Sequence, residues 1–453
     1  MTGEVAVACS RHLYSRLRTL IAGPGAQRAA GNLGWLVAER GLRLGLNFGV
    51  GIWVSRYLGP EQFGSLSYVM AVVAVVSILA ELGLDAVVRR EVIAAPEAAA
   101  SVVAGARWLR FAGGVAGYVL LGGVMAWGGT NAEERVLLLV FGLTLFQPAL
   151  WVVDLWFHAR LEAKYATMAQ VGALAVGAAV RIALVLGKAP VTAFAWAAVG
   201  EMAVAALLLG LLARRRGLMA PVRWVDRAVL RRLLAESWPL MASGFAVVLY
   251  MRIDAVMLRV IRDESEVGIY AAATRFAEIW YFVPVALASS LLPALLRARE
   301  RGVAAYRRRW QQMFDLNAAL AFVIAIAGAA TAPWLVRVCY GEAYAASASV
   351  LVLHIWSCVF VFLGVARGQW LVNEKRSYFY LGASVAGAVA NVGLNMWLIP
   401  VWGANGAAVA TLVSFAGSAW LSSFFHPGVR EVGWMQTRAL LIPLLGWRYL
   451  RRS

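Results

Sequence analysis

Long apolar runs separated by short polar stretches dominate the chain. An α-helix rises 1.5 Å per residue, so about 20 mostly apolar residues cross the roughly 30 Å of hydrocarbon in a bilayer. Unpaired backbone groups cannot face lipid, and each run is therefore expected to be helical. The pattern predicts twelve membrane spans, at residues 36–57, 67–88, 108–127, 135–157, 167–187, 191–213, 234–260, 270–295, 314–338, 348–372, 378–400 and 404–425.

The polar stretch "SRYLGPEQFGSLSYV", residues 55–69, separates the first two runs. Proline disfavours helical geometry in the residue before it, so Gly59-Pro60 is expected to end the first helix. Gly64 is expected to let the backbone turn tightly back into the membrane. The stretch therefore predicts a hairpin between two spans.

The same landmarks recur in the second half of the chain. Trp35 and Gly64 frame the first run and its polar exit, and Trp238 and Gly268 frame the seventh run in the same way, at an offset of about 204 residues. Six helices per half is an even number, so the two repeats would share one orientation in the membrane.

These landmarks and the basic stretches divide the chain into five expected parts. The two six-helix lobes are joined by the basic stretch "ARRRGLMAPVRWVDRAVLRR" and flanked by basic ends. The expected parts are a basic amphipathic segment at 1–35, a lobe at 36–213, a linker at 214–233, a second lobe at 234–425 and a tail at 426–453.

Composition agrees with an all-α polytopic membrane protein. The 453 residues are 62% hydrophobic and 15% charged, whereas soluble proteins carry about 25% charged residues. Most of the lysines and arginines behind the net charge of +18 fall in alternate loops, which predicts that both termini are cytoplasmic. The few basic residues expected on the other side are Arg56, Arg135, Lys188, Arg259, Arg262 and Arg337.

This distribution makes membrane topology the first explanation of the positive charge, and we expect no nucleic-acid partner. The three cysteines and four histidines form no metal-binding spacing, and no phosphate-binding loop is present. We therefore expect neither a metal nor a cofactor.

Three passages resemble a known family. Residues 35–92, residues 237–282 and "FQPALWVVDLWFHARLEAKYA" at 146–166 resemble the O-antigen and exopolysaccharide flippases, the oligosaccharide flippases among the polysaccharide biosynthesis proteins. This family belongs to the multidrug/oligosaccharidyl-lipid/polysaccharide (MOP) exporter superfamily. The resemblance implies two six-helix lobes around a central cavity that opens alternately to each side. It also implies a polyprenyl-diphosphate-linked oligosaccharide as substrate, moved across the bacterial cytoplasmic (inner) membrane.

Arginines within the expected spans are the candidate substrate-binding residues. A charged side chain at bilayer depth costs roughly 2.5–3.5 kcal/mol on insertion scales, so it should face a partner or a wet cavity. Guanidinium binds phosphate oxygens bidentately and keeps its charge. The expected cationic cavity contains Arg40, Arg43, Arg181, Arg252, Arg275 and Arg367.

The alternative interpretation differs from one arginine to the next. Arg181 and Arg252 lie deeper in their spans, where snorkelling is harder and the cavity is favoured. Arg40 and Arg43 lie near the cytoplasmic end of their span and are placed to snorkel toward headgroups. Arg275 has Glu278 three residues further along, so an ion pair within one helix is the rival there. Arg367 stands among small residues in "GVARGQW", where packing is the alternative.

Acidic residues in the spans are the candidates for gating or ion coupling. Glu81 and Asp85, in "ELGLDAVVRRE", are expected to close the inner mouth against Arg40 or Arg43, with an ordinary helix terminus as the alternative. The remaining two candidates are Asp254, for which Arg275 is the hypothetical partner, and Glu278.

Competing functions make different demands on the sequence. A membrane polysaccharide polymerase or ligase commonly carries a sizeable outer loop, and only short outer loops are expected here, so we expect no enzyme. A multidrug exporter should favour an acidic, aromatic cavity without deep arginines, and a peptidoglycan lipid-precursor flippase usually has fourteen helices. Membrane lipids, a polysaccharide polymerase and a chain-length regulator are the partners considered alongside the lipid-linked oligosaccharide.

Overall fold

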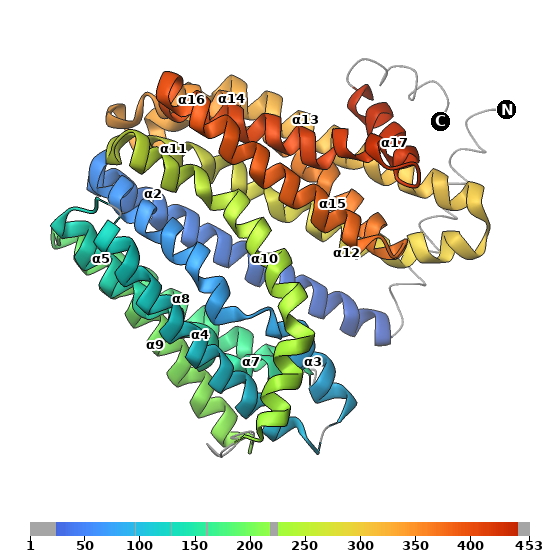
Figure 1. Ribbon diagram of the computed structural model, residues 1–453, viewed down its shortest axis with the longest axis horizontal. Helices are drawn as coiled ribbons and strands as arrows, with labels where there is room; N and C mark the ends of the chain where they lie inside the picture. The colour runs from blue at the N-terminus through green and yellow to red at the C-terminus, as the bar shows by residue number, and fades with distance from the viewer. Residues whose placement is uncertain (1–23, 96, 128, 160–161, 218–224, 443–453) are drawn as a thin grey trace.

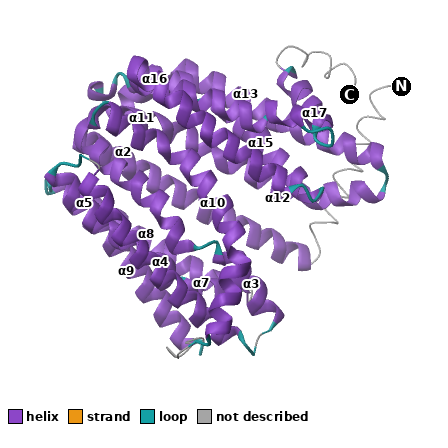
Figure 2. Ribbon diagram, viewed as in Figure 1, coloured by secondary structure: helices purple, strands orange, loops and turns teal. Residues whose placement is uncertain are grey.

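The computed structural model describes residues 24–442 apart from residues 96, 128, 160–161 and 218–224, and every regular element in that part of the chain is a helix (Figures 1 and 2). The first half contains α2 (Pro24–Glu81), α3 (Leu84–Ala94), α4 (Ala99–Trp127), α5 (Ala132–Gly142), η1 (Leu143–Phe146), α6 (Gln147–Leu150), α7 (Val152–Ala159), α8 (Ala163–Leu186) and α9 (Val191–Arg215). The second half contains α10 (Arg227–Ile261), α11 (Glu264–Glu278), η2 (Ile279–Tyr281), α12 (Phe282–Glu300), α13 (Val303–Tyr340), η3 (Glu342–Tyr344), α14 (Ser347–His354), α15 (Ser357–Asn373), α16 (Ser377–Ala419), η4 (Leu421–Phe425) and α17 (Arg430–Leu440).

The described helices account for most of the expected spans. Eight helical stretches are long and apolar enough to cross a membrane, or up to nine if the bent α11–α12 pair counts as one span. Two of the eight, Gly45–Ala94 and Ser377–Phe425, contain a backbone break at Gly59 and Gly403 respectively, so each supplies two spans. Counted in this way the described stretches supply ten or eleven spans, close to the twelve expected, and the expected all-α membrane architecture is confirmed.

Gly59 makes the first reversal of the chain. Its φ of 71° lies in the left-handed region, which glycine enters without steric cost. Pro60 then begins the next helix, where its missing N–H leaves no hydrogen bond unmade. The sequence correctly placed a break here, but the expectation that Gly64 turns the backbone was wrong, because Gly64 lies inside the new helix.

Gly64 instead permits a close contact between the two lobes. A Cβ atom on Gly64 would lie 1.7 Å from the carbonyl oxygen of Glu264, and a Cβ on Gly268 would lie 2.0 Å from the carbonyl oxygen of Pro60. The two contacts are therefore reciprocal and follow the offset of about 204 residues found in the sequence. Only glycine at both positions lets α2 and α11 approach this closely.

We call the side of the molecule that carries Gly59, Asn131, Arg262 and Gly403 the Gly59 edge. Arg262 Nη2 donates to the carbonyl oxygen of Pro400 at 2.7 Å, which ties α10 to the break in α16. In Figure 1 the helices of the two halves come together at this edge, on the left of the view, and run apart from it. Contacts that join the lobes are therefore concentrated on one side of the molecule.

Several helix ends differ from the sequence prediction. Helix α2 begins at Pro24 rather than at 36, and α10 begins at Arg227, inside the expected linker. Helix α17 lies in the expected tail, whereas residues 1–23 of the expected N-terminal segment lie outside the described part of the chain. Good helix formers in the flanking polar sequence extend the helices beyond their apolar centres.

The fourth span is broken rather than continuous. The single span expected at 135–157 comprises α5, the 3₁₀ turn η1, the short α6 and α7. Pro148 sits in the first turn of α6, where a proline is tolerated because its nitrogen has no proton to donate. The break moves the second half of this span aside and creates recesses on both sides of it.

Candidate functional site

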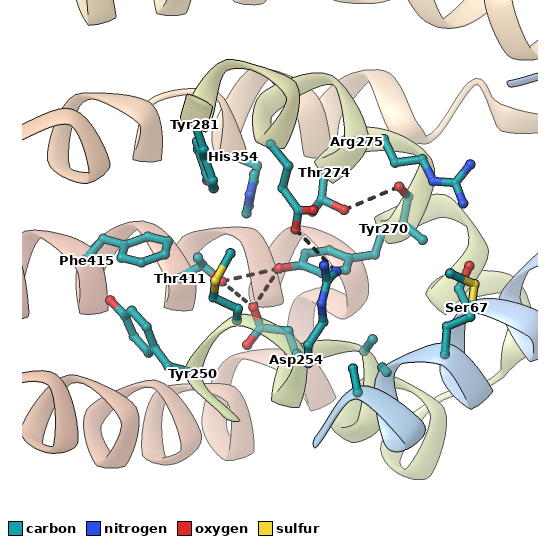
Figure 3. Close-up of a pocket in the computed structure, with 18 residues that line it drawn as sticks. Ser67, Tyr250, Asp254, Tyr270, Thr274, Arg275, Tyr281, His354, Thr411 and Phe415 are labelled. Atoms are coloured by element: carbon teal, nitrogen blue, oxygen red, sulfur yellow. Dashed lines mark hydrogen bonds and ion pairs between the residues drawn. The ribbon is translucent and has the colours of Figure 1, made fainter. Parts of the chain in front are cut away.

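A cavity of about 240 Å³ lies between α2, α10, α11 and α16 (Figure 3). Its wall combines aromatic rings with ionisable and hydroxyl side chains. The polar residues that line it include Ser67, Arg252, Asp254, Tyr270, Arg275, Glu278 and Thr411. It therefore has the chemistry of a polar binding site inside a membrane protein.

Asp254 forms the most buried polar cluster of this cavity. Its side chain is 2% exposed and accepts hydrogen bonds from Tyr270 Oη at 2.6 Å, Thr411 Oγ1 at 2.5 Å and Asn395 Nδ2 at 2.6 Å. Asn395 Nδ2 also lies 3.0 Å from Asn391 Oδ1. Three neutral donors thus surround a carboxylate that makes no ion pair with any described residue.

The ion pair expected between Asp254 and Arg275 does not form. The Arg275 side chain points away from Asp254 toward α2, where its Nη1 donates to Ser55 Oγ at 3.2 Å. Its guanidinium also lies 4.6 Å from the centre of the Phe63 ring. Arg275 therefore links the second lobe to the first.

Glu278 pairs with Arg252 instead of Arg275. Arg252 Nη1 lies 3.5 Å from Glu278 Oε1, and the two side chains are 42% and 28% exposed. The helical neighbours Arg275 and Glu278, the alternative considered from their spacing, make no ion pair among the described contacts. At this distance and exposure, Arg252 keeps donors available to the cavity.

Arg181 lines a second cavity, of about 170 Å³, which Arg275 also borders. Arg181 lies on α8 and pairs with Glu201 of α9 at 2.7 Å. Both side chains are about one quarter exposed, at 23% and 24%. The deep position expected for Arg181 is thus accompanied by an acidic partner.

A third cavity, of about 420 Å³, contains the acids expected to gate the inner mouth. Glu81, Asp85 and Asp154 line it together with Arg110. Asp85 forms its ion pair with Arg110, whose side chain is 4% exposed. Among the described contacts Asp85 thus pairs with Arg110 and not with Arg43, and the gating role of Glu81 and Asp85 stays a prediction.

The structure describes the contacts of the Arg43 side chain but not those of Arg40. Arg43 Nη2 donates to Gln170 Oε1 at 3.2 Å, and Gln170 Nε2 donates to Asp154 Oδ1 at 3.3 Å. These contacts direct Arg43 toward α8 and, through Gln170, toward α7. The side chain of Arg40 lies outside the described part of the structure.

Arg367 is held by packing contacts. Its side chain is 3% exposed, and Nη1 donates to Ser422 Oγ at 2.6 Å and Ser423 Oγ at 3.0 Å. Both serines lie in η4, directly after α16, so the guanidinium fastens α15 to the end of the last span. The packing alternative describes this residue, and we do not place it in the cavity.

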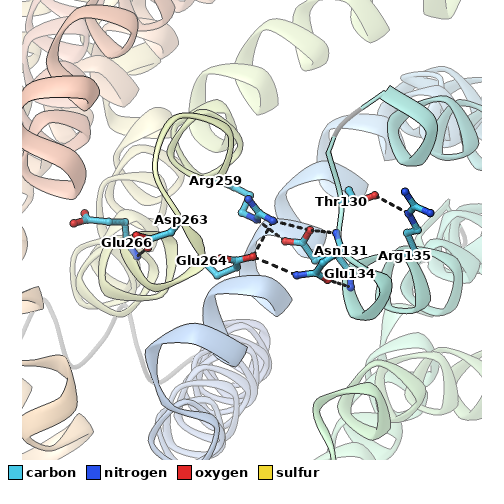
Figure 4. A network of polar contacts seen from close by, with 8 residues as sticks. All are labelled: Thr130, Asn131, Glu134, Arg135, Arg259, Asp263, Glu264 and Glu266. Carbon is cyan, nitrogen blue, oxygen red and sulfur yellow. Dashed lines mark hydrogen bonds and ion pairs between the residues drawn. The ribbon is translucent and has the colours of Figure 1, made fainter.

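A cluster of charged residues joins the lobes at the Gly59 edge (Figure 4). Arg259 of α10 binds Glu134 of α5 through two nitrogens, at 2.6 and 3.1 Å, and Glu264 of α11 at 2.8 Å. Glu134 is fully buried, and Asn131 Nδ2 donates to Glu264 Oε1 at 3.3 Å. We call these four residues the edge cluster.

Sequence reasoning missed Arg110 and the edge cluster. Arg110 lies near the start of the third expected span but is not among the candidate cavity residues, and Arg259 was expected on the outer side. Asn131 and Glu134 do carry a local signal, because they form the two ends of a capping box at the start of α5. Nothing in the sequence linked that signal to Arg259.

Comparison with known proteins places the chain in a family. The family model described as "Polysaccharide biosynthesis protein" matches residues 29–299, more than half of the chain. No curated protein matches.

Solved structures share the fold at low sequence identity. An inward-facing multidrug resistance MATE family transporter of the MOP superfamily is 17% identical, with a TM-score of 0.71 over 88% of this chain and 94% of that one. The lipid II flippase MurJ, in an inward closed conformation, is 12% identical, with a TM-score of 0.71 over 92% of each chain. An outward-facing MATE family transporter gives a TM-score of 0.57 at 16% identity over 88% and 93%. The chain belongs to the polysaccharide biosynthesis protein family, and it is a multi-pass membrane protein with the fold of the MOP-superfamily transporters.

Proposed function

We propose that the protein flips polyprenyl-diphosphate-linked oligosaccharides across the bacterial cytoplasmic membrane for surface polysaccharide biosynthesis. The observation that carries this proposal is the position of Arg252 and Arg275 at the wall of the cavity between the lobes. Two guanidinium groups at this depth suit a diphosphate, which offers several oxygens for bidentate hydrogen bonds. Membership of the polysaccharide biosynthesis protein family supports the same substrate class.

The orientation follows from the distribution of basic residues. We propose that the Gly59 edge is extracytoplasmic and that both termini are cytoplasmic. In this conformation the edge cluster and the Gly64–Gly268 contact close the extracytoplasmic side. The higher TM-score to the inward-facing than to the outward-facing MATE structure, 0.71 against 0.57, supports an inward-facing state.

Asp254 is the proposed coupling residue. A small cation stabilises a buried carboxylate most where the carboxylate has no basic partner, because an unpaired charge is costly in a low-dielectric interior. The hydroxyl oxygens of Thr411 and Tyr270 lie beside it, and these, with the carboxylate itself, suit a proton or a sodium ion, while the Asn395 amide contacts the carboxylate through its nitrogen. Binding would rearrange the hydrogen bonds that hold α10 against α11 and α16, which connects ion binding to lobe movement.

A multidrug exporter is the second candidate. Tyr250, Tyr281 and Phe415 line the same cavity as Asp254 and Glu278, and this combination suits an organic cation. The peptidoglycan lipid-precursor flippase shares the diphosphate chemistry of the first proposal. A polysaccharide polymerase and a chain-length regulator remain proposed partners of the flippase function alone.

A complementation experiment tests the first proposal. A deletion strain should lose surface polysaccharide and regain it when the wild-type gene is supplied. Arg252→Gln and Arg275→Gln should each abolish this rescue at unchanged protein level, whereas Arg308→Gln, at an exposed position on α13, should leave it intact. Full rescue by both cavity variants would contradict the diphosphate role, and drug sensitivity of the deletion strain with normal polysaccharide would favour the exporter.

A further inference from the structure

An apolar groove of about 380 Å³ lies on the first lobe, between α4, the broken fourth span and α9. One face of α4 forms its first wall, with Trp108 and Phe111 each 47% exposed. The small residues Ala206, Gly210 and Ala213 on α9 form the facing wall. Small side chains on one wall and aromatic rings on the other leave a slot between two membrane-spanning helices.

Arg107 is the one charged residue among those that line the groove. It is partly exposed, and it makes no hydrogen bond or ion pair with any described residue. Arg110, three residues further along α4, lies about 60° around the helix from Arg107 and pairs with Asp85 in the inner cavity. The two arginines therefore line neighbouring cavities, and the one at the groove has no partner among the described residues.

Arg107 lies in the half of α4 that is remote from the Gly59 edge. It lies eight residues into α4, about 12 Å along the helix at 1.5 Å per residue. On the facing helix, Ala213 is followed by the exposed Arg214 and Arg215 at the end of α9. The groove thus opens toward a basic rim on the side opposite the Gly59 edge.

We propose that this groove is a binding site for an anionic glycerophospholipid. One acyl chain lies between α4 and α9, and the phosphate pairs with Arg107. A guanidinium holds phosphate oxygens through two parallel hydrogen bonds, and an anionic headgroup removes the penalty of an unpaired charge in an apolar wall. A zwitterionic lipid brings its own cation to the same place and is the weaker ligand.

The position of the groove favours a membrane lipid over the transported substrate. Trp108 and Leu150 are 47% and 46% exposed on the outside of the lobe, whereas Arg110 lines the separate inner cavity with Glu81 and Asp85. A molecule in the groove is therefore outside the cavity between the lobes. This inference does not depend on which substrate the protein carries.

Binding of defined lipids to the purified full-length protein tests whether the charge of Arg107 holds the lipid headgroup. Native mass spectrometry in mixed micelles should detect retained phosphatidylglycerol in preference to phosphatidylcholine of the same chain length. Arg107→Gln should weaken phosphatidylglycerol retention by about tenfold, as expected for the loss of one charge-assisted contact, and Arg107→Lys should restore part of it. The control Arg308→Gln removes an exposed cation elsewhere and should bind lipid as the wild type does.

A second pair of variants tests whether the groove must be open for the lipid to bind. A Cβ added to Gly210 or to Gly200 would meet no atom within 4 Å, so a side chain can start from either position of α9 without a clash at Cβ. Gly210→Leu fills the groove and should reduce phosphatidylglycerol retention, whereas Gly200→Leu, away from the groove, should not. Unchanged retention in both Arg107→Gln and Gly210→Leu would overturn the proposal. Equal retention of the two phospholipids, or displacement of phosphatidylglycerol by equimolar polyprenyl phosphate, would overturn it as well.

Discussion

Gly64 and Gly268 meet across the contact between the two lobes. A Cβ on Gly64 would lie 2.9 Å from the backbone nitrogen of Gly268, and each glycine also faces a backbone carbonyl of the opposite helix. The contact brings α2 and α11 together backbone to backbone, close to Gly59. The halves of an internal repeat thus touch through equivalent residues.

Alanine at either glycine should open or weaken this contact. Gly64→Ala and Gly268→Ala place a methyl group against backbone, which cannot move aside as a flexible side chain can. We expect each variant to lose about 1–3 kcal/mol of stability in the conformation closed at the Gly59 edge. Thermal unfolding of the purified protein measures the loss, with Gly200→Ala as a control at an open position. Wild-type unfolding temperatures in both variants would refute the tight contact.

The edge cluster should control closure of the same side. Arg259→Gln leaves the fully buried Glu134 without its cation, a change that costs about 3–5 kcal/mol when a buried pair is broken. We expect the Gly59 edge to open. Spin labels at Glu133→Cys on α5 and Ser349→Cys on α14, in a background without the native cysteines, should report a longer distance.

The double variant Arg259→Gln with Glu134→Gln provides the control for that measurement. It removes both charges of the buried pair and should return much of the closed population. If the label distance in Arg259→Gln equals that of the wild type, the cluster does not hold the lobes together.

Neutralising Asp254 should uncouple transport from its cation. Asp254→Asn retains the size of the side chain but removes the charge that a proton or sodium ion would compensate. We expect surface polysaccharide to fall in the complementation assay and the remaining transport in vesicles to lose its dependence on sodium or on a pH gradient. A carboxylate introduced at Asn317 is not expected to replace Asp254, because Asn317 lies on α13 and its side chain donates to the Met313 carbonyl oxygen. Retained ion dependence in Asp254→Asn would remove Asp254 from the coupling role.

Variants of the Arg181–Glu201 ion pair distinguish a substrate-binding role of Arg181 from a purely structural role. Arg181→Gln leaves a carboxylate without its partner at 2.7 Å, and we expect lower protein level and no polysaccharide. The double variant Arg181→Gln with Glu201→Gln should recover the protein level, because neither charge is then unpaired. If Arg181 also binds the substrate, polysaccharide stays low in the double variant; full recovery of polysaccharide would show a structural role alone.

The sequence by itself determined the class of protein and the approximate position of the spans. Hydropathy is a local property, and a run of apolar residues must be helical in lipid whatever its neighbours are. The break at Gly59-Pro60 was also visible, because proline and glycine act on their own backbone. The repeat was detectable because the landmarks of the two halves keep the same spacing.

The direction in which each charged side chain points depends on how the helices pack. Helical spacing places residues on a face of their own helix, but the rotation of that helix is set by packing against its neighbours. The sequence therefore could not separate Arg107 from Arg110, or show that Asp254 faces Tyr270 and Thr411 while Arg275 reaches Ser55. Partners more than a hundred residues apart, such as Glu134 and Arg259, meet only when both lobes have folded and docked.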